Sequence, residues 1–381
     1  MRVLVLAAFL LFISAGDLAR AGDDVAAWIV SQGGRVTREP SGAVTAADLT
    51  GSWITDADLT RLATLSNLRR LDLSRTKITD AGLEHLKPLN GVSELRLRYA
   101  ESITDNGVAH IKGWKHLERL DLRGTKITSR VFESLAGLTA LRSLDIAFTG
   151  VSDEGFEELA ALSRLEELAM GGNRILGPAL SLLKLLPALR RLDAGGIQRV
   201  DSGLWGLALS DRNLEKLGAL TQLEVLDLSG ANIADRGLDR PGHALARRTE
   251  LRSLADLRTL TRLHTLNLNR VPVSGEALQV LAELPALKHL MAGYNPLMDD
   301  EAAEVFAKVR ELETLFLTET NVSNTTLERL QAAKHLKKLY LGGTRVSAEA
   351  VENFRRSRPD CNVIWWEKRA ADRDKPQSGA G

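Results

Sequence analysis

The feature that most constrains this chain is a unit of about 24 residues that recurs almost throughout, clearest at residues 68–89 (LRRLDLSRTKITDAGLEHLKPL). Most steps between successive units are 24 residues and two are 25. Such persistence predicts a stack of coils, each of which buries its apolar face only against its neighbours. The last apolar strand residue of each unit falls at Leu49, Leu73, Leu97, Leu122, Ile146, Met170, Ala194, Leu228, Leu268, Ala292, Leu317, Leu341 and Trp365.

Each unit has a strand, a turn and a short helix. Leu71 and Leu73 point to one face of a strand and Asp72 to the other. Thr76 follows at the turn, where a short polar side chain is expected to bond backbone groups of the adjacent coil. Thr79 then supplies helix N-cap chemistry, and we expect the same of Ser152, Ser274 and Ser347.

The TxITDxGLxxLxxL units resemble leucine-rich repeats of the 24-residue type found in many secreted bacterial proteins. They are also similar to the cysteine-containing repeats that accompany F-box domains, although that cysteine and an F-box-like segment are absent here. The resemblance covers residues 43–366. It implies an α/β fold, a right-handed horseshoe with about 12–13 parallel strands on its concave face and short helices on its convex face. It also implies protein recognition without a catalytic residue.

The ends of the chain differ from the repeats. Residues 1–21 have the layout of a signal peptide, with Arg2, an apolar run at residues 3–13 and Ala19-Arg20-Ala21 before the expected cleavage point. The run is shorter than the roughly 20 residues that span a bilayer, so we expect no integral membrane segment after cleavage. The mature protein is predicted to be exported, to the periplasm, the cell envelope or the medium.

The mature chain divides by composition into three parts. Residues 22–42 are predicted to form an N-terminal cap, with a helix at 24–32 and an extended segment at 35–38. Residues 43–366 form the solenoid, and residues 367–381 are charged and rich in small residues, as in a disordered tail.

Two units, 195–228 and 229–268, exceed the period. Their excess lies at residues 202–214 and 237–257, and Leu251 to Leu254 imitates a strand start, so the second could hide a degenerate repeat. Insertions in such arrays emerge as loops or longer helices, often at a binding face. Equally, the solenoid could accommodate the extra residues without their having a function. In either case we expect the solenoid to be least regular there.

The composition gives no sign of catalysis, a cofactor or a metal site. The number of lysine and arginine residues (50) nearly equals that of aspartate and glutamate (49). This balance does not give the excess of positive charge that is typical of proteins that bind nucleic acid. The single cysteine, Cys361, is predicted to be a small buried residue rather than a reactive thiol. The acidic run Asp299-Asp300-Glu301 suggests either calcium or, more ordinarily, the start of a helix.

The outward-facing residues between the two strand leucines form one column on the concave face. Its first part is charged, and opposite charges side by side predict a self-neutralised surface rather than a binding site. The column runs through Asp72, Arg96, Asp121, Asp145, Ala169, Asp193, Asp227, Asn267, Met291, Phe316, Tyr340 and Ile364.

The last part of the column is apolar. Aromatic residues carry about 150–250 Å² of surface each, and soluble proteins seldom expose several together without purpose. Alternatively, the C-terminal tail covers them or they belong to a cap. The candidate partner-binding residues are Met291, Tyr294, Phe316, Tyr340, Ile364 and Trp366.

These observations favour an exported, non-enzymatic scaffold that recognises a protein partner through its concave face. The first alternative is an envelope component that self-associates through the same residues. An F-box-like substrate adaptor and an enzyme with a pocket between the long units are weaker alternatives.

Overall fold

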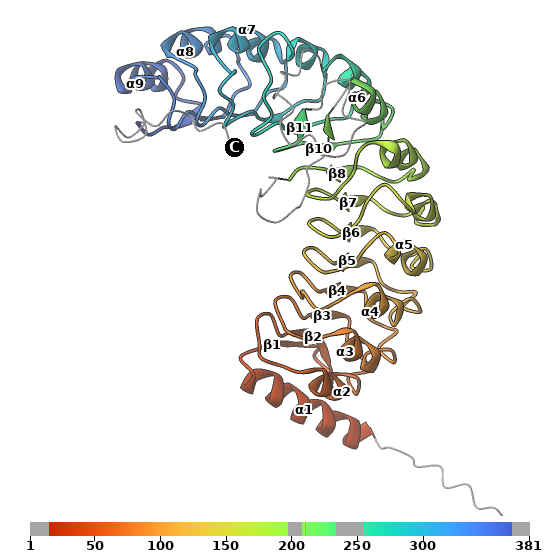
Figure 1. Cartoon of the computed structure of the whole chain (residues 1–381). Coiled ribbons are helices and arrows are strands. Elements are labelled where there is room, and N and C mark those ends of the chain that lie inside the picture. The colour runs from red at the N-terminus through yellow and green to blue at the C-terminus, as the bar shows by residue number, and fades with distance from the viewer. Residues whose placement is uncertain (1–14, 197–207, 210, 234–253, 368–381) are drawn as a thin grey trace, which may run out of the picture.

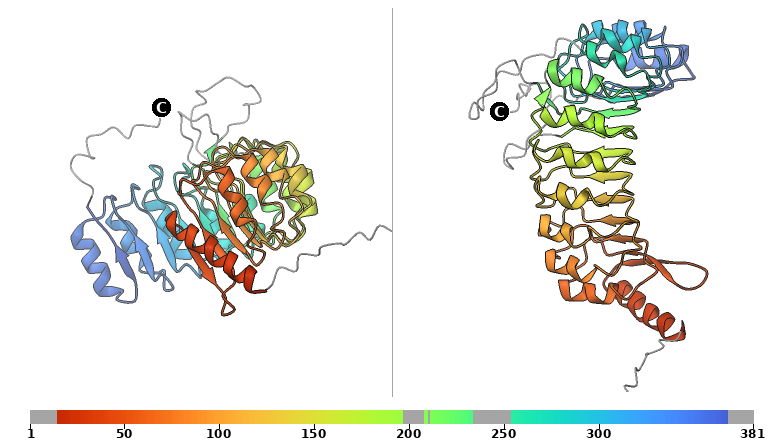
Figure 2. Two further views of the ribbon diagram at one scale, coloured as in Figure 1. Left: turned by 90° about the horizontal axis from the view of Figure 1, so that it is seen from below. Right: turned by 90° about the vertical axis from the view of Figure 1, so that its right-hand side faces the viewer.

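The computed structural model describes residues 15–196, 208–209, 211–233 and 254–367, which form one curved solenoid (Figure 1). Strands line the inside of the curve and helices lie along its outside. Seen from the side, the coils are stacked one above the next, with helices on one flank and strands on the other (Figure 2). The predicted α/β solenoid with a concave sheet is therefore confirmed.

One sheet of fourteen strands runs the length of the solenoid. Strand β1 pairs antiparallel with β2, and the remaining thirteen run parallel, as the repeat predicts. A second, two-stranded sheet pairs β9 (Ala208–Leu209) with β11 (Asn232–Ile233). The large sheet contains β1 (Arg35–Arg38), β2 (Val44–Asp48), β3 (Arg70–Asp72), β4 (Glu94–Arg96), β5 (Arg119–Asp121), β6 (Ser143–Asp145), β7 (Glu167–Ala169), β8 (Arg191–Asp193), β10 (Val225–Asp227), β12 (Thr265–Asn267), β13 (His289–Met291), β14 (Thr314–Phe316), β15 (Lys338–Tyr340) and β16 (Asn362–Ile364).

The helices are short because each crosses only one coil. The α-helices are α1 (Ala15–Ser31), α2 (Leu59–Leu62), α3 (Asp80–His85), α4 (Asp105–Ala109), α5 (Val131–Leu135), α6 (Asp211–Gly218), α7 (Asp300–Lys308), α8 (Asn324–Leu330) and α9 (Ala348–Ser357). The 3₁₀ helices are η1 (Asp56–Asp58), η2 (Phe156–Ala161), η3 (Pro178–Leu185), η4 (Ala255–Thr259) and η5 (Gln279–Glu283). No helix among the described residues is both long and apolar enough to cross a membrane.

The core is a continuous ladder of leucines between the sheet and the helices. Leu71 and Leu73 are buried, as are their counterparts in the other coils from Leu49 to Leu341. The final member, Trp365, is only partly buried and donates from Nε1 to the carbonyl of Val346 at 3.1 Å. Each coil thus fills the space between its two neighbours.

Helix α1 and strand β1 lie at the N-terminal end of the stack. Val25, Ala26 and Ile29 of α1 are buried against the first coil. The helix ends at Ser31, within one residue of the predicted end at residue 32, but it begins at Ala15 rather than at residue 24. The expected cleavage point after Ala21 therefore falls within α1, and residues 1–14 lie outside the described part.

The turn hydroxyls bond differently from our prediction. Thr76 Oγ1 donates to the carbonyl of Leu73 in its own coil at 2.7 Å, and Thr125, Thr149, Thr320 and Thr344 behave in the same way. The Thr149 hydroxyl also lies 3.3 Å from Asn173 Oδ1 in the next coil, so there the local bond and a contact between coils occur together. The longer asparagines reach the backbone of the preceding coil, where Asn173 and Asn295 donate to the carbonyls of Ile146 and Val273.

Helix capping is confirmed at Thr79 and Ser347, whose side chains accept from Ala81 N and Ala350 N. It is wrong at Ser152 and Ser274. In those coils the 3₁₀ helices η2 and η5 start later, and the residues that precede them provide no side-chain cap.

A carboxylate relay joins the helix starts of successive coils. Asp80 accepts hydrogen bonds from the backbone N (2.8 Å) and Oγ1 (2.5 Å) of Thr104, one coil further on. Asp56 holds Thr79 in this way, Asp105 holds Thr128 and Asp300 holds Ser323. In three of these coils the residue so held is the N-cap of the helix, and Thr128 lies two residues before the N-cap of α5.

The two long units leave the sheet uninterrupted. Strand β10 pairs directly with β8 on one side and with β12 on the other, so a hidden repeat contributes no strand between β10 and β12. Leu254 precedes helix η4 rather than starting a strand. Of the excess residues at 202–214 and 237–257, most (202–207, 210 and 237–253) lie outside the described part, as does the tail beyond 367.

Arg358 and Cys361 close the last coil. The Arg358 guanidinium donates to the carbonyls of Ala333, Lys334 and Leu336 and pairs with Asp360. Cys361 is buried, and burial raises the pKa of its thiol to about 11. The predicted buried position of the thiol is confirmed.

We expect the Asp300 relay to stabilise the fold in a pH-dependent way. Burial alone would raise the pKa of Asp300, but hydrogen bonds from Ser323 and Thr326 hold it below its usual value. The stabilisation is therefore fully present above the unfolded-state pKa of about 3.9 and is lost as the pH falls through the lower folded-state pKa. Asp300→Ala should lower the free energy of unfolding by about 2 kcal/mol at neutral pH.

Urea unfolding of Asp300→Ala and of Glu301→Ala, an exposed neighbour in the same helix turn, measures this difference. The deficit of Asp300→Ala should shrink in acid, and the Glu301 control should stay near the wild type. A deficit that does not change with pH would contradict the relay.

Cys361 should be inert in the folded protein. A thiol with a pKa near 11 is protonated at neutral pH and hence unreactive. A disulfide reagent such as Ellman's should label it only after denaturation. Rapid stoichiometric labelling of the native protein would show that the last coil opens.

Candidate interaction surface

The predicted concave column exists in register along the sheet. Asp72 lies opposite Arg96, Arg96 opposite Asp121, and the pairing continues to Tyr340 opposite Ile364. The column crosses the long units without a shift, because Asp193 pairs with Asp227 and Asp227 with Asn267. For each residue of this column we can therefore ask whether its side chain stabilises the coil or is free to contact a partner.

The aspartates of the column have a structural task that the sequence analysis missed. Asp72 Oδ1 accepts from the backbone N of Ser74, two residues on, at 2.9 Å. Asp121, Asp145, Asp193 and Asp227 accept equivalent bonds, and so does Asn267 through its amide oxygen. These side chains shape the turn after each strand, so their recurrence does not mark a binding site.

The charged surface, which we define as Arg96, Arg98, Asp121, Arg123, Asp145 and Asp193, is paired within itself. Arg98 Nε lies 3.0 Å from Asp121 Oδ2, and Arg123 Nε lies 2.9 Å from Asp145 Oδ2. Arg123 also reaches Asp193, and Arg96 reaches Asp72 and Glu94. The predicted self-neutralisation is confirmed, and a shallow hollow of about 500 Å³ over Arg98 and Asp121 is lined by these paired groups.

The pKa values of two carboxyl groups on this surface are raised. Burial, together with the charge of Asp145, raises the pKa of Asp121. Burial and the charge of Asp227 likewise raise the pKa of Asp193. In both cases burial is the larger cause and the charge of the neighbouring carboxylate the smaller one.

The aromatic patch, defined as Met291, Tyr294, Phe316, Tyr340, Ile364 and Trp366, brings together all the predicted partner-binding residues. Met291, Phe316, Tyr340 and Ile364 are half-buried members of adjacent strands β13–β16. Tyr294 and Trp366 are 39% and 47% exposed. The centroid of the Phe316 ring lies 6.2 Å from that of Tyr294 and 5.3 Å from that of Tyr340, so these three rings form a continuous row.

Glycines beneath the patch let two of the rings lie close to the sheet. A Cβ atom at Gly293 would come within 2.6 Å of the Phe316 ring, and one at Gly342 within 2.0 Å of the Trp366 ring. Both rings therefore rest on neighbouring backbone. Between the two glycines lies Thr318, which is 1% exposed and whose Oγ1 has no hydrogen-bond partner among the described residues.

The edge of the patch carries backbone in an uncommon conformation. Tyr294 has φ +55°, and the Arg270 guanidinium lies 4.5 Å from the centroid of its ring. Left-handed φ at a residue with a Cβ costs about 1–2 kcal/mol. The same position is left-handed in other coils, at Arg75, Tyr99, Phe148, Arg270 and Glu319 and at Gly51, Gly124, Gly172, Gly230 and Gly343.

In the N-terminal half, two of the aromatic residues at this position are followed by a glycine in the next coil. The Tyr99 ring lies against Gly124, where a Cβ would come within 2.3 Å of it. The Phe148 ring lies against Gly172 in the same manner, at 2.5 Å. Contact with the next coil thus offsets the cost of the left-handed turn.

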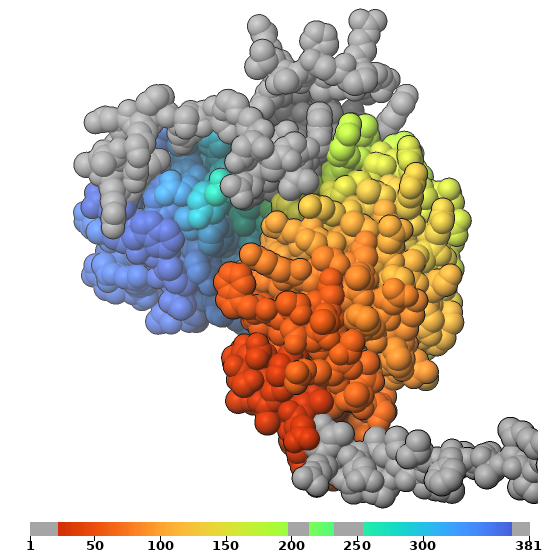
Figure 3. Space-filling view, turned by 60° about the horizontal axis from the view of Figure 1, so that its bottom comes forward, coloured from red at the N-terminus to blue at the C-terminus, as the bar shows by residue number. Residues whose placement is uncertain are grey.

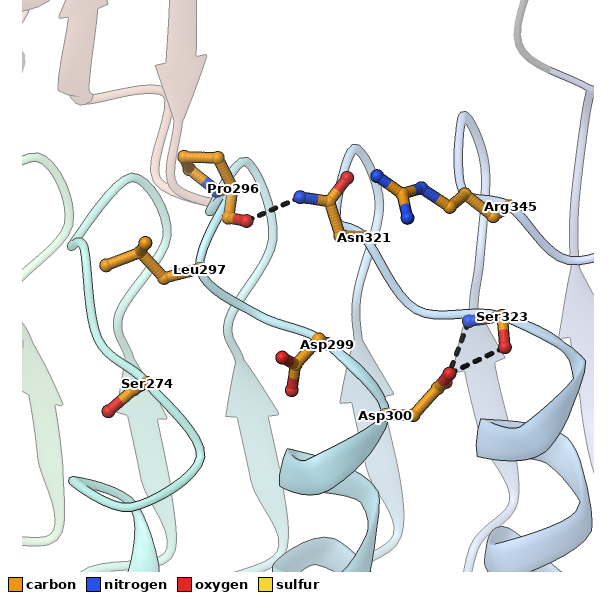
Figure 4. A pocket seen from close by; sticks show the side chains of 8 residues that line it. All are labelled: Ser274, Pro296, Leu297, Asp299, Asp300, Asn321, Ser323 and Arg345. Atoms are coloured by element: carbon orange, nitrogen blue, oxygen red, sulfur yellow. Dashed lines mark hydrogen bonds between the residues drawn. The ribbon is translucent and has the colours of Figure 1, made fainter.

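A polar pocket of about 560 Å³ opens at the edge between the sheet and the helices (Figure 4). Its carboxylates already have structural partners, since Asp300 binds Ser323 and Asp299 caps helix α7 through Glu301 N. The helix-start explanation of the acidic run is therefore confirmed. Within the described ranges no cluster of histidine, cysteine, aspartate and glutamate side chains could hold a metal.

Replacing Thr318 by valine tests the buried hydroxyl. An unpaired buried hydroxyl costs about 1–3 kcal/mol, and valine has nearly the same shape. Thr318→Val should therefore raise the free energy of unfolding by about 1 kcal/mol, as measured by urea denaturation. Thr320→Val, which removes a hydroxyl bonded to Leu317 O, is the matched control and should destabilise.

Three comparisons place the chain among known proteins. A family model described as a leucine-rich repeat region matches residues 52–354. An internalin of Listeria monocytogenes is similar in structure, with a TM-score of 0.58 and 19% identity over 91% of this chain and 94% of the internalin. A leucine-rich-repeat protein of Leptospira interrogans gives a TM-score of 0.53 and 18% identity over 80% of this chain and 74% of that one.

No curated protein sequence matches the chain. At these identities the two solved structures share its fold and carry no further inference. The repeat model, in contrast, spans most of the solenoid. The chain belongs to the leucine-rich-repeat family.

Proposed function

We propose that this protein is an exported, non-enzymatic scaffold that captures a protein partner through the aromatic patch. The observation that carries the proposal is the patch itself, with its continuous rings on the concave side of β13–β16. Leucine-rich-repeat folds commonly serve as protein-binding scaffolds, and the family and its internalin-like neighbours are typically non-enzymatic. The predicted signal peptide at residues 1–21 supports export.

The contrast within the concave face supports the choice of surface. The charged surface is already occupied by its own ion pairs, and exposed pairs of this kind contribute little to affinity. Apolar and aromatic side chains carry most of the binding energy at protein interfaces. The partner therefore gains more from the aromatic patch than from the larger charged surface.

Self-association through the same patch is the alternative. The patch lies at the C-terminal end of the solenoid, where β16 is the last strand of the sheet. A second copy could cover it in a two-fold arrangement. Sedimentation of the mature protein at high concentration separates the two functions, since a strict monomer leaves the patch free for another protein.

Phe316→Ser/Tyr340→Ser should reduce capture of the partner at least about tenfold. The mature protein is immobilised and exposed to envelope and culture-fluid proteins of the source organism. Because both rings are half-buried, each substitution should also cost about 1–2 kcal/mol of stability, which thermal unfolding measures. Arg70→Ser/Arg119→Ser, at the exposed first residues of β3 and β5, is the control and should leave capture unchanged. Undiminished capture by the folded aromatic variant would overturn the proposal.

A further inference from the structure

We propose that a basic edge of the sheet in the last coils binds an acidic segment of a protein, rich in glutamate or aspartate. The basic edge consists of the lysines and arginines that lie between the end of a helix and the first residue of the next strand, for β12 to β15. Its members are Arg262, Lys288, Arg310, Lys334, Lys337 and Lys338. This surface is separate from the aromatic patch and adds a second interaction site to the proposed function.

Positive charge gathers at this edge although the chain as a whole is nearly neutral. Strands β12 to β15 run parallel, so the segments that lead into them meet at one edge of the sheet. These segments carry six lysines and arginines and three histidines against two glutamates, whereas the segments that leave the strands carry two arginines against three acidic residues. The first set is 260–265, 284–289, 309–314 and 331–338, and the second is 268–278, 292–299, 317–323 and 341–347. The coils that carry them are coloured teal to blue in Figure 3.

The helix dipole does not account for all of this charge. Basic residues are favourable at the C-terminus of a helix, but the effect falls off within the last turn. Lys337 and Lys338 lie seven and eight residues beyond the end of α8 at Leu330. Their charge is therefore available for a purpose other than completing the helix.

Most members of the basic edge have no acidic partner. Four of them are exposed and form no ion pair within the part of the chain that the structure describes, namely Arg262, Arg310, Lys334 and Lys338. An anion that binds them therefore does not have to displace a carboxylate of the protein. This distinguishes the basic edge from the charged surface, whose arginines are already paired.

The positive side chains are close enough to act on one another. Burial is the main cause that lowers the pKa of His289, the first residue of β13. The charge of Glu313 opposes this shift. The charges of His264, Lys288 and Lys338 add to it. A bound anion relieves repulsion of this kind, which favours its binding.

A carboxylate of the protein itself shows how this edge holds an anion. Glu313 Oε1 lies 3.3 Å from Lys288 Nζ, and its Oε2 lies 2.9 Å from Lys337 Nζ. The two lysines belong to the coils before and after that of Glu313, and their hydrogen bonds hold the pKa of this carboxyl below its usual value. Lys338 follows directly in the chain and is unpaired, so it is available for a carboxylate of another protein.

The composition of the edge favours an acidic polypeptide over other polyanions. Proteins that bind single-stranded nucleic acid stack its bases on aromatic side chains, and aromatic residues also mark surfaces that enter a lipid interface. The four segments that lead into β12 to β15 contain no phenylalanine, tyrosine or tryptophan. Four of the six members are lysines, which lack the planar fork with which arginine recognises phosphate.

The test is a titration of the full mature protein with a fluorescently labelled oligoglutamate peptide, followed by fluorescence anisotropy. A glycine–serine peptide of equal length is the neutral probe. We expect saturable binding of oligoglutamate alone, weakened at least about tenfold when the salt concentration rises from about 50 mM to about 500 mM, because exposed charges are screened. Lys334→Gln/Lys338→Gln should weaken the binding about three- to tenfold, since it removes two unpaired charges.

Lys126→Gln/Arg345→Gln is the matched control. It removes two positive charges as well, from exposed residues that follow β5 and β15 at the opposite edge of the sheet. This variant should bind oligoglutamate like the wild type, and both variants should unfold at the wild-type temperature. Equal weakening by the two variants would show that net charge alone decides, and would overturn the site.

The outcomes separate this inference from the proposed function. A wild type that captures its protein partner but does not bind oligoglutamate overturns the inference and leaves the function standing. A wild type that binds oligoglutamate but captures no protein does the reverse. Phe316→Ser/Tyr340→Ser should leave oligoglutamate binding unchanged, and its loss in that variant would overturn the separate site. Preferential binding of duplex DNA, or of vesicles rich in anionic phospholipid, would overturn the assignment of an acidic polypeptide.

Discussion

Hydrogen bonding between successive coils is the constraint on which the rest of this structure depends. A coil here has only a three-residue strand and a short helix, and neither can satisfy its own backbone groups or bury its own leucines. The strand ladder supplies one set of bonds, such as Leu73 N to Arg96 O at 2.9 Å. The carboxylate relay from Asp80 to Thr104 supplies another on the helical side. Leucines fill the volume between these two lines of bonds.

The same constraint decides which side chains are free for recognition. Column aspartates such as Asp72 accept a backbone hydrogen bond in the turn after the strand, and neighbouring arginines such as Arg96 form ion pairs with them. Beyond Asn267 the column loses its carboxylates, and Phe316 and Tyr340 take positions where no turn bond is made by the side chain. The side chains of this part of the face are therefore not committed to the turn. After Met291 the turn is held by Asn269 of the preceding coil, whose Oδ1 accepts from the backbone N of Gly293.

The period of the sequence was enough to predict the sheet, its register and the six residues of the aromatic patch, because each follows from counting along the repeat. It was not enough to predict which atoms a turn hydroxyl would reach. The Thr76 hydroxyl bonds Leu73 rather than the next coil. Which acceptor the hydroxyl reaches depends on interatomic distances of a few ångströms, and the sequence period does not contain these distances. The Asp80–Thr104 relay did leave a signal, an aspartate recurring one coil before a cap residue, but its meaning depends on the lateral offset between coils. The start of α1 lies ahead of the repeats, so the period carries no information about it.

The two places where an aromatic ring at a left-handed turn lies over a glycine of the next coil also limit how the array can grow. Tyr99 faces Gly124, and Phe148 faces Gly172. Copying the coil of Tyr99 or of Phe148 by itself would set one ring against another, whereas copying that coil together with the glycine-bearing coil after it would preserve the contact. At these two places the piece that can be added without strain is therefore a ring-bearing coil and its glycine-bearing neighbour.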